Sequence, residues 1–315
     1  MAYVLMAGES TAAGIKRVIE EELEAAAAQL GKKSIASRDE AIHEARKSVK
    51  KIRAALRLVE DDLPVLFNRE NRRLRDTGRK LAGFRDAAAS IEIFDKVIAG
   101  LGDHPGKAAL GSIRRVLQQH KRETTQGAGL KAVLDQLVTL LSSAKKRVIE
   151  WPLEADGFPI IAKGLERTFR RGRTAMAAAQ EEESPENYHD WRKRVKDHFY
   201  QLLLLENLWT SQMRGQMKTL KELETCLGDD HDLVLLLEML NARRADFKEK
   251  DLVSFQSAAS HHQKKLRERT VSLGHEIYHE QPADFVGRVD KQWEAWQKGL
   301  SASSIRRRTR SSTAR

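Results

Sequence analysis

Cysteine, proline and long apolar runs are scarce in this sequence. A single cysteine, Cys226, among 315 residues excludes an intramolecular disulfide and is typical of a reducing compartment, so we expect a cytoplasmic protein. No uncharged apolar run reaches the roughly 18 residues of a membrane-spanning helix, and the first residues lack the basic start of a signal peptide. We therefore expect neither a membrane span nor a secretory leader.

Acidic residues are outnumbered by basic ones. The chain has 56 lysines and arginines against 45 carboxylates, a formal net charge of +11 and a pI of about 9.7. Its last fifteen residues, 301–315, hold five arginines and no acid, and we expect them to form a disordered tail. The rest of the chain is basic as well, which favours acidic partners.

The scarcity of proline and the long stretches of Ala, Leu, Glu, Lys and Arg predict helix nearly throughout. Sustained period-two alternation is absent, so we expect no sheet. Ser10 can cap a first helix that ends at Gly31, and Pro185 suits the first turn of another. The expected helices cover about 10–30, 38–62, 65–99 with a break near Gly83, 107–124, 128–149, 158–183, 185–209, 211–226, 229–248, 250–273 and 284–299.

One motif occurs twice. His-Glu-Ala-Arg-Lys-Ser-Val-Lys at 43–50 is matched by His-Asp-Trp-Arg-Lys-Arg-Val-Lys at 189–196, with five identical positions at one offset of 146 residues. The same offset, without a gap, carries Asp86 onto Asp232. This repetition indicates an internal duplication. We expect a first repeat at 5–150, a linker at 151–157 and a second repeat at 158–300.

On a helix, the basic residues of the motif share one face. In the first copy they recur every three to four residues, on another face than the apolar residues Val49 and Ile52. Like charges at this spacing destabilise an isolated helix by about 0.2–0.5 kcal/mol a pair. A solvated face has no need of the same stripe twice, so we hypothesise that a polyanion neutralises it.

The expected polyanion site draws on both repeats and on a second basic strip in the helix that follows each motif. Its candidate residues are His43, Arg46, Lys47, Lys50, Arg53, Arg72, Arg75, Arg85, His189, Arg192, Lys193, Lys196, Lys218 and Lys221. The residues of the second strips can equally be solvated, and each motif histidine can instead form a local hydrogen bond at the start of its helix. Asp86 and Asp232 are expected to orient an arginine or to cap a helix.

These motifs resemble the CHAD domain, the conserved histidine α-helical domain. The resemblance rests on the two motif copies, on Arg85-Asp86, on Leu227-Gly228 with Asp232, on the segment 164–173 and on a C-terminal pattern from Leu273 to Trp296. It covers about residues 5–300. It implies an all-α fold of two related four-helix bundles with pseudo-two-fold symmetry around a basic channel or groove.

The resemblance also implies a function. CHAD domains bind inorganic polyphosphate, and some associate with polyphosphate or polyhydroxyalkanoate granules. We therefore expect a non-catalytic polyphosphate-binding protein without a cofactor or a metal. The second repeat departs from the pattern, because Phe199 stands opposite Arg53 and His231 opposite Arg85. The two halves are thus expected to share the ligand unequally.

A nucleic-acid-binding protein is the first alternative. The charge and the Arg-rich tail favour it, and a polyphosphate-binding protein can also bind nucleic acid as a secondary partner. The basic stripes, however, carry no regularly interleaved aromatic residues for base stacking, and no standard nucleic-acid-reading motif is visible.

Metal enzymes are the second alternative. His275-Glu-Ile-Tyr-His279 matches the zinc-peptidase pattern H-E-x-x-H, although nothing marks a third ligand. The run from Asp229 to Asp232, Asp-Asp-His-Asp, resembles the clusters of metal-dependent phosphohydrolases, but the remaining ligands are not visible.

Overall fold

The chain folds into helices alone wherever the structure describes it. The computed structural model describes residues 3–32, 38–101, 110–126, 129–154 and 156–312, with the side chains of Arg85, 125–126 and 300–312 excepted, and no strand occurs in these ranges. This confirms the all-α prediction. The helices are α1 (Thr11–Leu30), α2 (Arg38–Leu58), α3 (Pro64–Lys80), α4 (Ala82–Ala99), α5 (Gly111–Gln126), α6 (Leu130–Ile149), α7 (Pro159–Glu181), α8 (Pro185–Leu204), α9 (Ser211–Ala242), α10 (Glu249–Ile277) and α11 (Pro282–Ser312), with the short 3-10 helices η2 (Glu206–Leu208) and η3 (Arg244–Asp246).

The predicted helix starts are confirmed by their caps. The Ser10 hydroxyl accepts a hydrogen bond from the backbone N–H of Ala13, and Gly31 ends the same helix. Ser184 caps α8 in the same way, and Pro185 occupies the first helical position. None of the helices in the described ranges has the length and apolar character that crossing a bilayer requires.

Three predicted boundaries were wrong. α9 is one continuous helix, because Gly228 in its interior keeps helical geometry instead of ending the helix. α8 ends at Leu204, where the chain turns into η2, and not near residue 209. α11 continues to Ser312, so helix replaces the expected disorder at 301–312, where neither proline nor glycine interrupts the chain. Residues 313–315 lie outside the described part.

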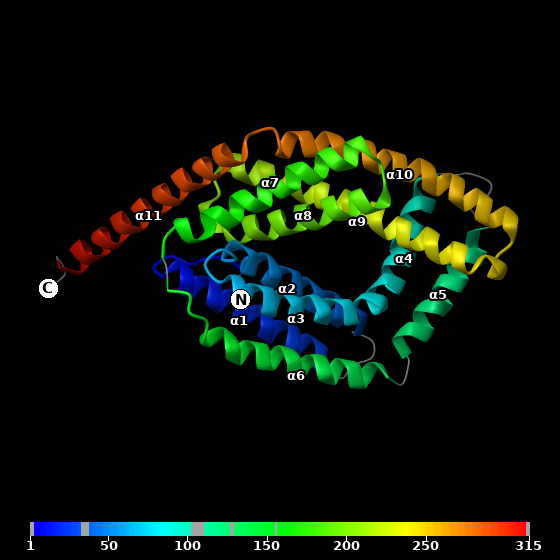
Figure 1. Cartoon of the computed structure of the whole chain (residues 1–315), viewed down its shortest axis with the longest axis horizontal. Coiled ribbons are helices and arrows are strands. Elements are labelled where there is room, and N and C mark those ends of the chain that lie inside the picture. Colours follow the sequence, from blue (N-terminus) through cyan, green and yellow to red (C-terminus); the bar gives the residue numbers. More distant parts are fainter. Residues whose placement is uncertain (1–2, 33–37, 102–109, 127–128, 155, 313–315) are drawn as a thin grey trace.

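The helices of the two halves have related neighbours. α1 packs on α2 and α6, and α7 packs correspondingly on α8 and α11. α4 contacts α5, and α9 contacts α10. The halves meet where α2 packs along α8 and touches α7, and again where α4 packs on α9. Figure 1 shows α6 and α10 along opposite edges of the molecule, with α11 leading away from it. The predicted two-fold relation between the halves stays a prediction.

The apolar core does not divide at the predicted linker. One cluster joins Ile52 of α2 with Leu165 of α7 and Trp191 of α8, all fully buried. A second cluster joins α4 and α5 to α9 and α10. The predicted linker itself is packed, since Trp151 and Leu153 are buried in the first cluster. Each apolar cluster therefore combines residues of both predicted halves.

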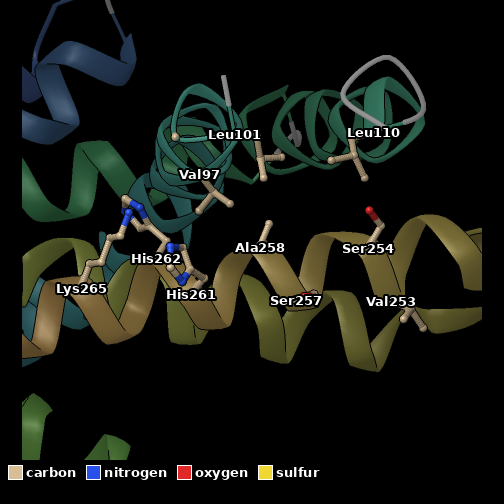
Figure 2. A pocket seen from close by; sticks show the side chains of 11 residues that line it. Val97, Leu101, Leu110, Val253, Ser254, Ser257, Ala258, His261, His262 and Lys265 are labelled. Atoms are coloured by element: carbon tan, nitrogen blue, oxygen red, sulfur yellow. The ribbon is translucent and has the colours of Figure 1, made fainter. Parts of the chain in front are cut away.

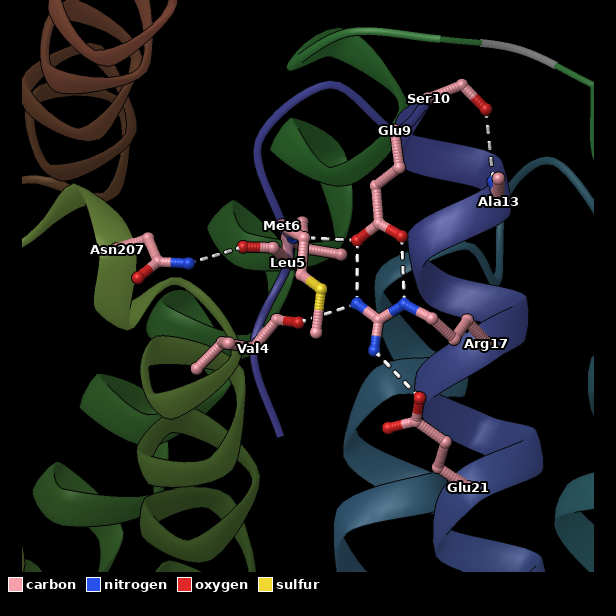
Figure 3. Close-up of polar contacts among 9 residues, drawn as sticks. All are labelled: Val4, Leu5, Met6, Glu9, Ser10, Ala13, Arg17, Glu21 and Asn207. Atoms are coloured by element: carbon pink, nitrogen blue, oxygen red, sulfur yellow. Dashed lines mark hydrogen bonds and ion pairs between the residues drawn. The ribbon is translucent and has the colours of Figure 1, made fainter. Parts of the chain in front are cut away.

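An N-terminal segment fastens the two halves together (Figure 3). The Arg17 guanidinium of α1 binds the Glu9 carboxylate at 2.7 Å and donates to the Val4 carbonyl at 2.9 Å. The backbone N–H of Leu5 donates to the Leu204 carbonyl at the end of α8 (2.9 Å), and Asn207 returns a hydrogen bond to the Leu5 carbonyl (2.7 Å). The N-terminal segment thus binds both α1 and the end of α8 with the residues that follow it.

A glycine permits the close approach of α7 to α2. A Cβ at Gly164 would lie 2.4 Å from the carbonyl oxygen of Leu58, the last residue of α2, whereas a Cβ at Gly228 in α9 would meet nothing within 4 Å. Both glycines are helical, so conformational freedom does not distinguish them. Of these two glycines, only Gly164 is required by packing.

Gly164→Ala should therefore destabilise the protein by about 3 kcal/mol, because backbone of two helices would have to separate. Gly228→Ala is the matched control and should stabilise by about 0.5–1 kcal/mol, since alanine is the better helix former. Urea denaturation followed by circular dichroism measures both. Equal effects of the two substitutions would contradict the packing described for α2 and α7.

Candidate anion-binding site

Packing of α2 along α8 brings the two copies of the motif together. Val49, Ile52 and Val195 are buried in one apolar cluster, and Gln201 of α8 donates to the Ala54 carbonyl of α2 at 3.2 Å. Beside this contact lie partly buried cations from both helices. We call them the basic seam, and it consists of Arg46, Lys50 and Arg53 of α2 with Arg192 and Lys196 of α8.

Lys50 shows how closely these charges approach. Burial lowers the pKa of its ammonium well below the ordinary range, and the positive charges of Lys196, Arg192 and Arg46 lower it further. Glu224 of α9 acts in the opposite direction but does not compensate. The two motif copies therefore face one region and repel each other across it.

The equivalent lysine of the second half has a carboxylate partner, and no such partner is found for Lys50 among the residues that the structure describes. Lys196 forms an ion pair with Glu224, which also pairs with Lys221 at 2.7 Å. Burial alone would raise the pKa of Glu224, but the two ammonium groups lower it to about 2. At the duplication offset, Glu224 corresponds to Gly78. The first half thus has no carboxylate at that position to stabilise the charged form of Lys50.

Further along α2 the seam continues toward α3. Arg53 donates to the Asn71 side chain of α3 at 2.9 Å. Burial, Arg57 and, less strongly, the α3 residues Arg75 and Arg79 lower the pKa of Arg53 to about 10, against the opposing charge of Asp197. Arg57 and Arg79 were not among the predicted site residues, although both fall on the helical spacing of predicted ones.

Carboxylates at the seam hold its arginines. Asp86 of α4 lies 3.8 Å from the Arg46 guanidinium, which is consistent with the predicted orienting role of this aspartate. Asp197 of α8 pairs with Arg57 of α2 at 3.2 Å. These contacts fix cationic side chains from the side and leave the seam with more cations than carboxylates.

The motif histidines lie in different surroundings. His189 of α8 faces His231 of α9, with 3.2 Å between the two Nδ1 atoms. His43 is half exposed, 4.0 Å from Glu44, and lines a shallow pocket with four carboxylates, which belong to Asp39, Glu40, Glu44 and Glu92. A phosphate is thus better placed beside His189 than beside His43.

The remaining predicted residues lie at the edge of the seam or outside it. Lys47 and Lys193 are half exposed, and each pairs with a carboxylate one turn earlier, Glu44 at 3.4 Å and Asp190 at 2.8 Å. Arg72 and Arg75 on α3, and Lys218 and Lys221 on α9, are exposed. The side chain of Arg85 lies outside the described residues. The repeated lysine–carboxylate pair was visible in the sequence, since Glu44 and Asp190 share the offset.

Comparison with known proteins identifies the family. The family model of the CHAD domain matches residues 17–241, which spans the basic seam and both motif copies. The chain belongs to the CHAD family. No curated protein matches it. Among solved structures, it is similar to the CHAD domain from the plant Ricinus communis, with 18% sequence identity, a TM-score of 0.57, and 89% of this chain and 94% of that chain covered.

At that identity the structural likeness shows a shared fold. The all-α CHAD architecture is thereby confirmed. Neither the family description nor the similar structure names a reaction.

The sequence patterns of metal enzymes are not assembled into sites in this CHAD domain. α10 ends at Ile277, so His279 lies past the helix, where its ring contacts the Glu276 carbonyl, while His275 contacts Gln180. Asp229 and Asp230 pair with Lys96 and Arg267 on different neighbouring helices. Among the described residues, no group of three or more His, Cys, Asp or Glu side chains is arranged to hold a metal ion.

A cavity with a partly apolar lining lies away from the seam (Figure 2). It has a volume of about 390 Å³ between the end of α4, the start of α5 and α10. Its lining combines apolar residues such as Val97 and Leu110 with His261, His262 and Lys265. It contains none of the predicted site residues.

Glu224 offers a test of the seam's electrostatics. Glu224→Gln should lower the free energy of unfolding at pH 7 by about 3 kcal/mol, because the folded state holds this carboxyl at a pKa of about 2 instead of 4.5. A lowered folded-state pKa contributes stability above pH 4.5, and this stability is lost as pH falls toward 2. The difference between wild type and variant should shrink over that range.

Urea denaturation at pH 7, 4.5 and 3 measures the effect. Glu222→Gln on the same helix is the control, because Glu222 pairs with Arg269 at an exposed position and should contribute less than about 1 kcal/mol. A pH-independent difference for Glu224→Gln would show that the carboxylate does not hold the seam's lysines.

Proposed function

We propose that this CHAD domain binds inorganic polyphosphate through the basic seam and does not convert it chemically. The observation that carries the proposal is the gathering of partly buried cations from both repeats around Lys50, with fewer carboxylates than cations. Such an arrangement is unfavourable in the free protein. A bound polyanion makes it favourable.

The chemistry of the seam suits a polymer of phosphates. Along α2, the basic residues from Arg46 to Arg57 span about 17 Å at 1.5 Å per residue, enough for several consecutive phosphates. Arginines can bridge two phosphate oxygens with their planar fork, and lysines act as point charges. No base recognition is needed for such a ligand. The affinity should depend steeply on salt, as it does for nucleic-acid backbones.

The proposal extends to the other predicted residues and to location. Lys47, Lys193, Arg72, Arg75, Lys218 and Lys221 would contact phosphates that continue beyond the seam, and the predicted basic channel or groove would be the path between the halves. Binding of the polymer would bring the protein to polyphosphate granules, or to polyhydroxyalkanoate granules that contain the polymer, within the cytoplasm.

Removing one arginine from each motif copy should weaken binding strongly. Arg46→Gln combined with Arg192→Gln should raise the Kd for long-chain polyphosphate about 100-fold or more at constant salt, since each lost charge-assisted contact is worth about 1.5–3 kcal/mol. The dependence of log Kd on log salt should become shallower by about one for each contact. Isothermal titration measures both quantities, and circular dichroism should show an unchanged helix content.

The control pair is Lys264→Gln with Lys298→Gln, which removes the same net charge from strongly exposed positions on α10 and α11. It should change the Kd less than threefold. An equal rise of the Kd in the two double variants would show that binding depends only on net charge, and would overturn the proposed site. Competition with single- and double-stranded nucleic acid at matched salt tests the alternative, which predicts that nucleic acid displaces polyphosphate at equal phosphate concentration.

A further inference from the structure

Two histidines from different helices meet inside the basic seam. His189 begins the second motif copy on α8, and His231 lies on α9, where the sequence comparison places it opposite Arg85. Their Nδ1 atoms are 3.2 Å apart and their ring centroids 4.4 Å apart. At this separation one neutral ring can donate to the other, whereas two protonated rings would repel each other unless an anion lay beside them.

We propose that His189 and His231 form a proton-accepting phosphate site within the basic seam, so that polyphosphate binding takes up protons there. The inference rests on the proposed function and assigns His231 to the ligand-binding residues. It also makes pH a regulator of the affinity.

Charged groups from several helices surround the pair, and together with burial they favour neutral rings in the free protein. On α8 these are Arg192, Lys193 and Lys196, opposed by Asp190, and Lys50 adds a further positive charge from α2. α9 contributes Asp232 and Glu224, which act on Lys196. The other packed helices engage other sides of α9, since Arg267 of α10 pairs with Asp230 and Lys96 of α4 pairs with Asp229. Cations therefore outnumber carboxylates around the rings.

Burial and these cations lower the pKa of both rings. The pKa of His231 falls to about 3, through burial first and then through Arg192, His189, Lys196 and Lys50. The pKa of His189 is lowered by burial, Lys193 and Arg192. A phosphate oxygen placed beside the rings reverses the sign of the local field, so the bound state favours protonated imidazoles that donate to the phosphate.

The sign of the pH dependence follows from this difference. The free protein lacks these protons near neutral pH and the complex holds them, so the affinity should increase as pH falls, by about tenfold per pH unit for each proton taken up. Ordinary exposed histidines would stop contributing below about pH 6.5, where they are already protonated in the free protein. The buried pair should continue to strengthen binding down to pH 5.

The duplication supplies a matched control. His43 occupies the equivalent position of the first copy but is half exposed and surrounded by carboxylates. It should contribute little to proton uptake, whatever its own effect on affinity.

Isothermal titration of the full chain with long-chain polyphosphate tests the inference. Titrations in two buffers of different ionisation enthalpy give the number of protons taken up, between pH 5 and 7.5 at constant salt. Long chains are used because only phosphate end groups titrate, near pH 6. The wild type should take up protons, and His231→Gln and His189→Gln should each reduce the uptake by at least half a proton. His43→Gln should keep the wild-type value between pH 5 and 6, where an ordinary exposed histidine no longer contributes.

The outcomes separate this inference from the proposed function. Binding with the same proton uptake in wild type and His231→Gln would overturn the histidine site and leave polyphosphate binding intact. A wild type that does not bind polyphosphate would overturn both. Helix content measured by circular dichroism shows that each glutamine variant is folded, and the buffer comparison on the wild type needs no substitution.

Discussion

The packing of α2 along α8 is the contact on which both the fold and the candidate site depend. Each helix carries its apolar residues and its cations on adjacent faces, so burying the first brings the second together. Val49, Ile52 and Val195 are buried in the apolar cluster that both helices share, and each such side chain contributes about 1.5–3 kcal/mol. That gain offsets the cost of burying Lys50 beside other cations, and burial and these cations together lower the pKa of Lys50. The cations of the two helices lie close together because the apolar faces beside them are buried.

The two copies of the motif have diverged in a consistent direction. In the first half, Gly78 stands at the position that Glu224 holds in the second half, and Arg53 stands where the second half has Phe199. The first copy therefore has one carboxylate fewer and one arginine more than the second. The second copy is partly neutralised by Glu224 and carries a pair of neutral imidazoles. Its charge depends on pH and on what is bound, so the halves contribute differently to one site.

The sequence was sufficient for much of the fold and for the pairing of the motifs. Caps at Ser10 and Ser184 and the 3.6-residue periodicity are local signals, and the structure follows them. The duplication offset identified equivalent residues, yet it could not identify partners in space. Glu224 and His231 were missed for this reason. Both lie on α9, but their partners Lys196 and His189 lie on α8, and the offset of 146 residues does not relate α9 to α8. The sequence also did not predict the apolar core shared by the residues before and after 151–157, because burial between the two halves produces no periodic pattern in the sequence.

Residues that look equivalent in the sequence can have different roles in the structure, and only their packing distinguishes these roles. Gly164 and Gly228 both lie in helices, but the first faces the backbone of α2 and the second faces open space. Likewise, Lys47 and Lys50 belong to one motif, but Lys47 pairs with Glu44 on its own helix while Lys50 is buried among cations. A bound polyanion relieves electrostatic repulsion only at residues such as Lys50, which are buried beside other cations. Binding free energy should therefore concentrate at the few cations that folding has brought together, and the many exposed ones should mainly extend the attraction outward.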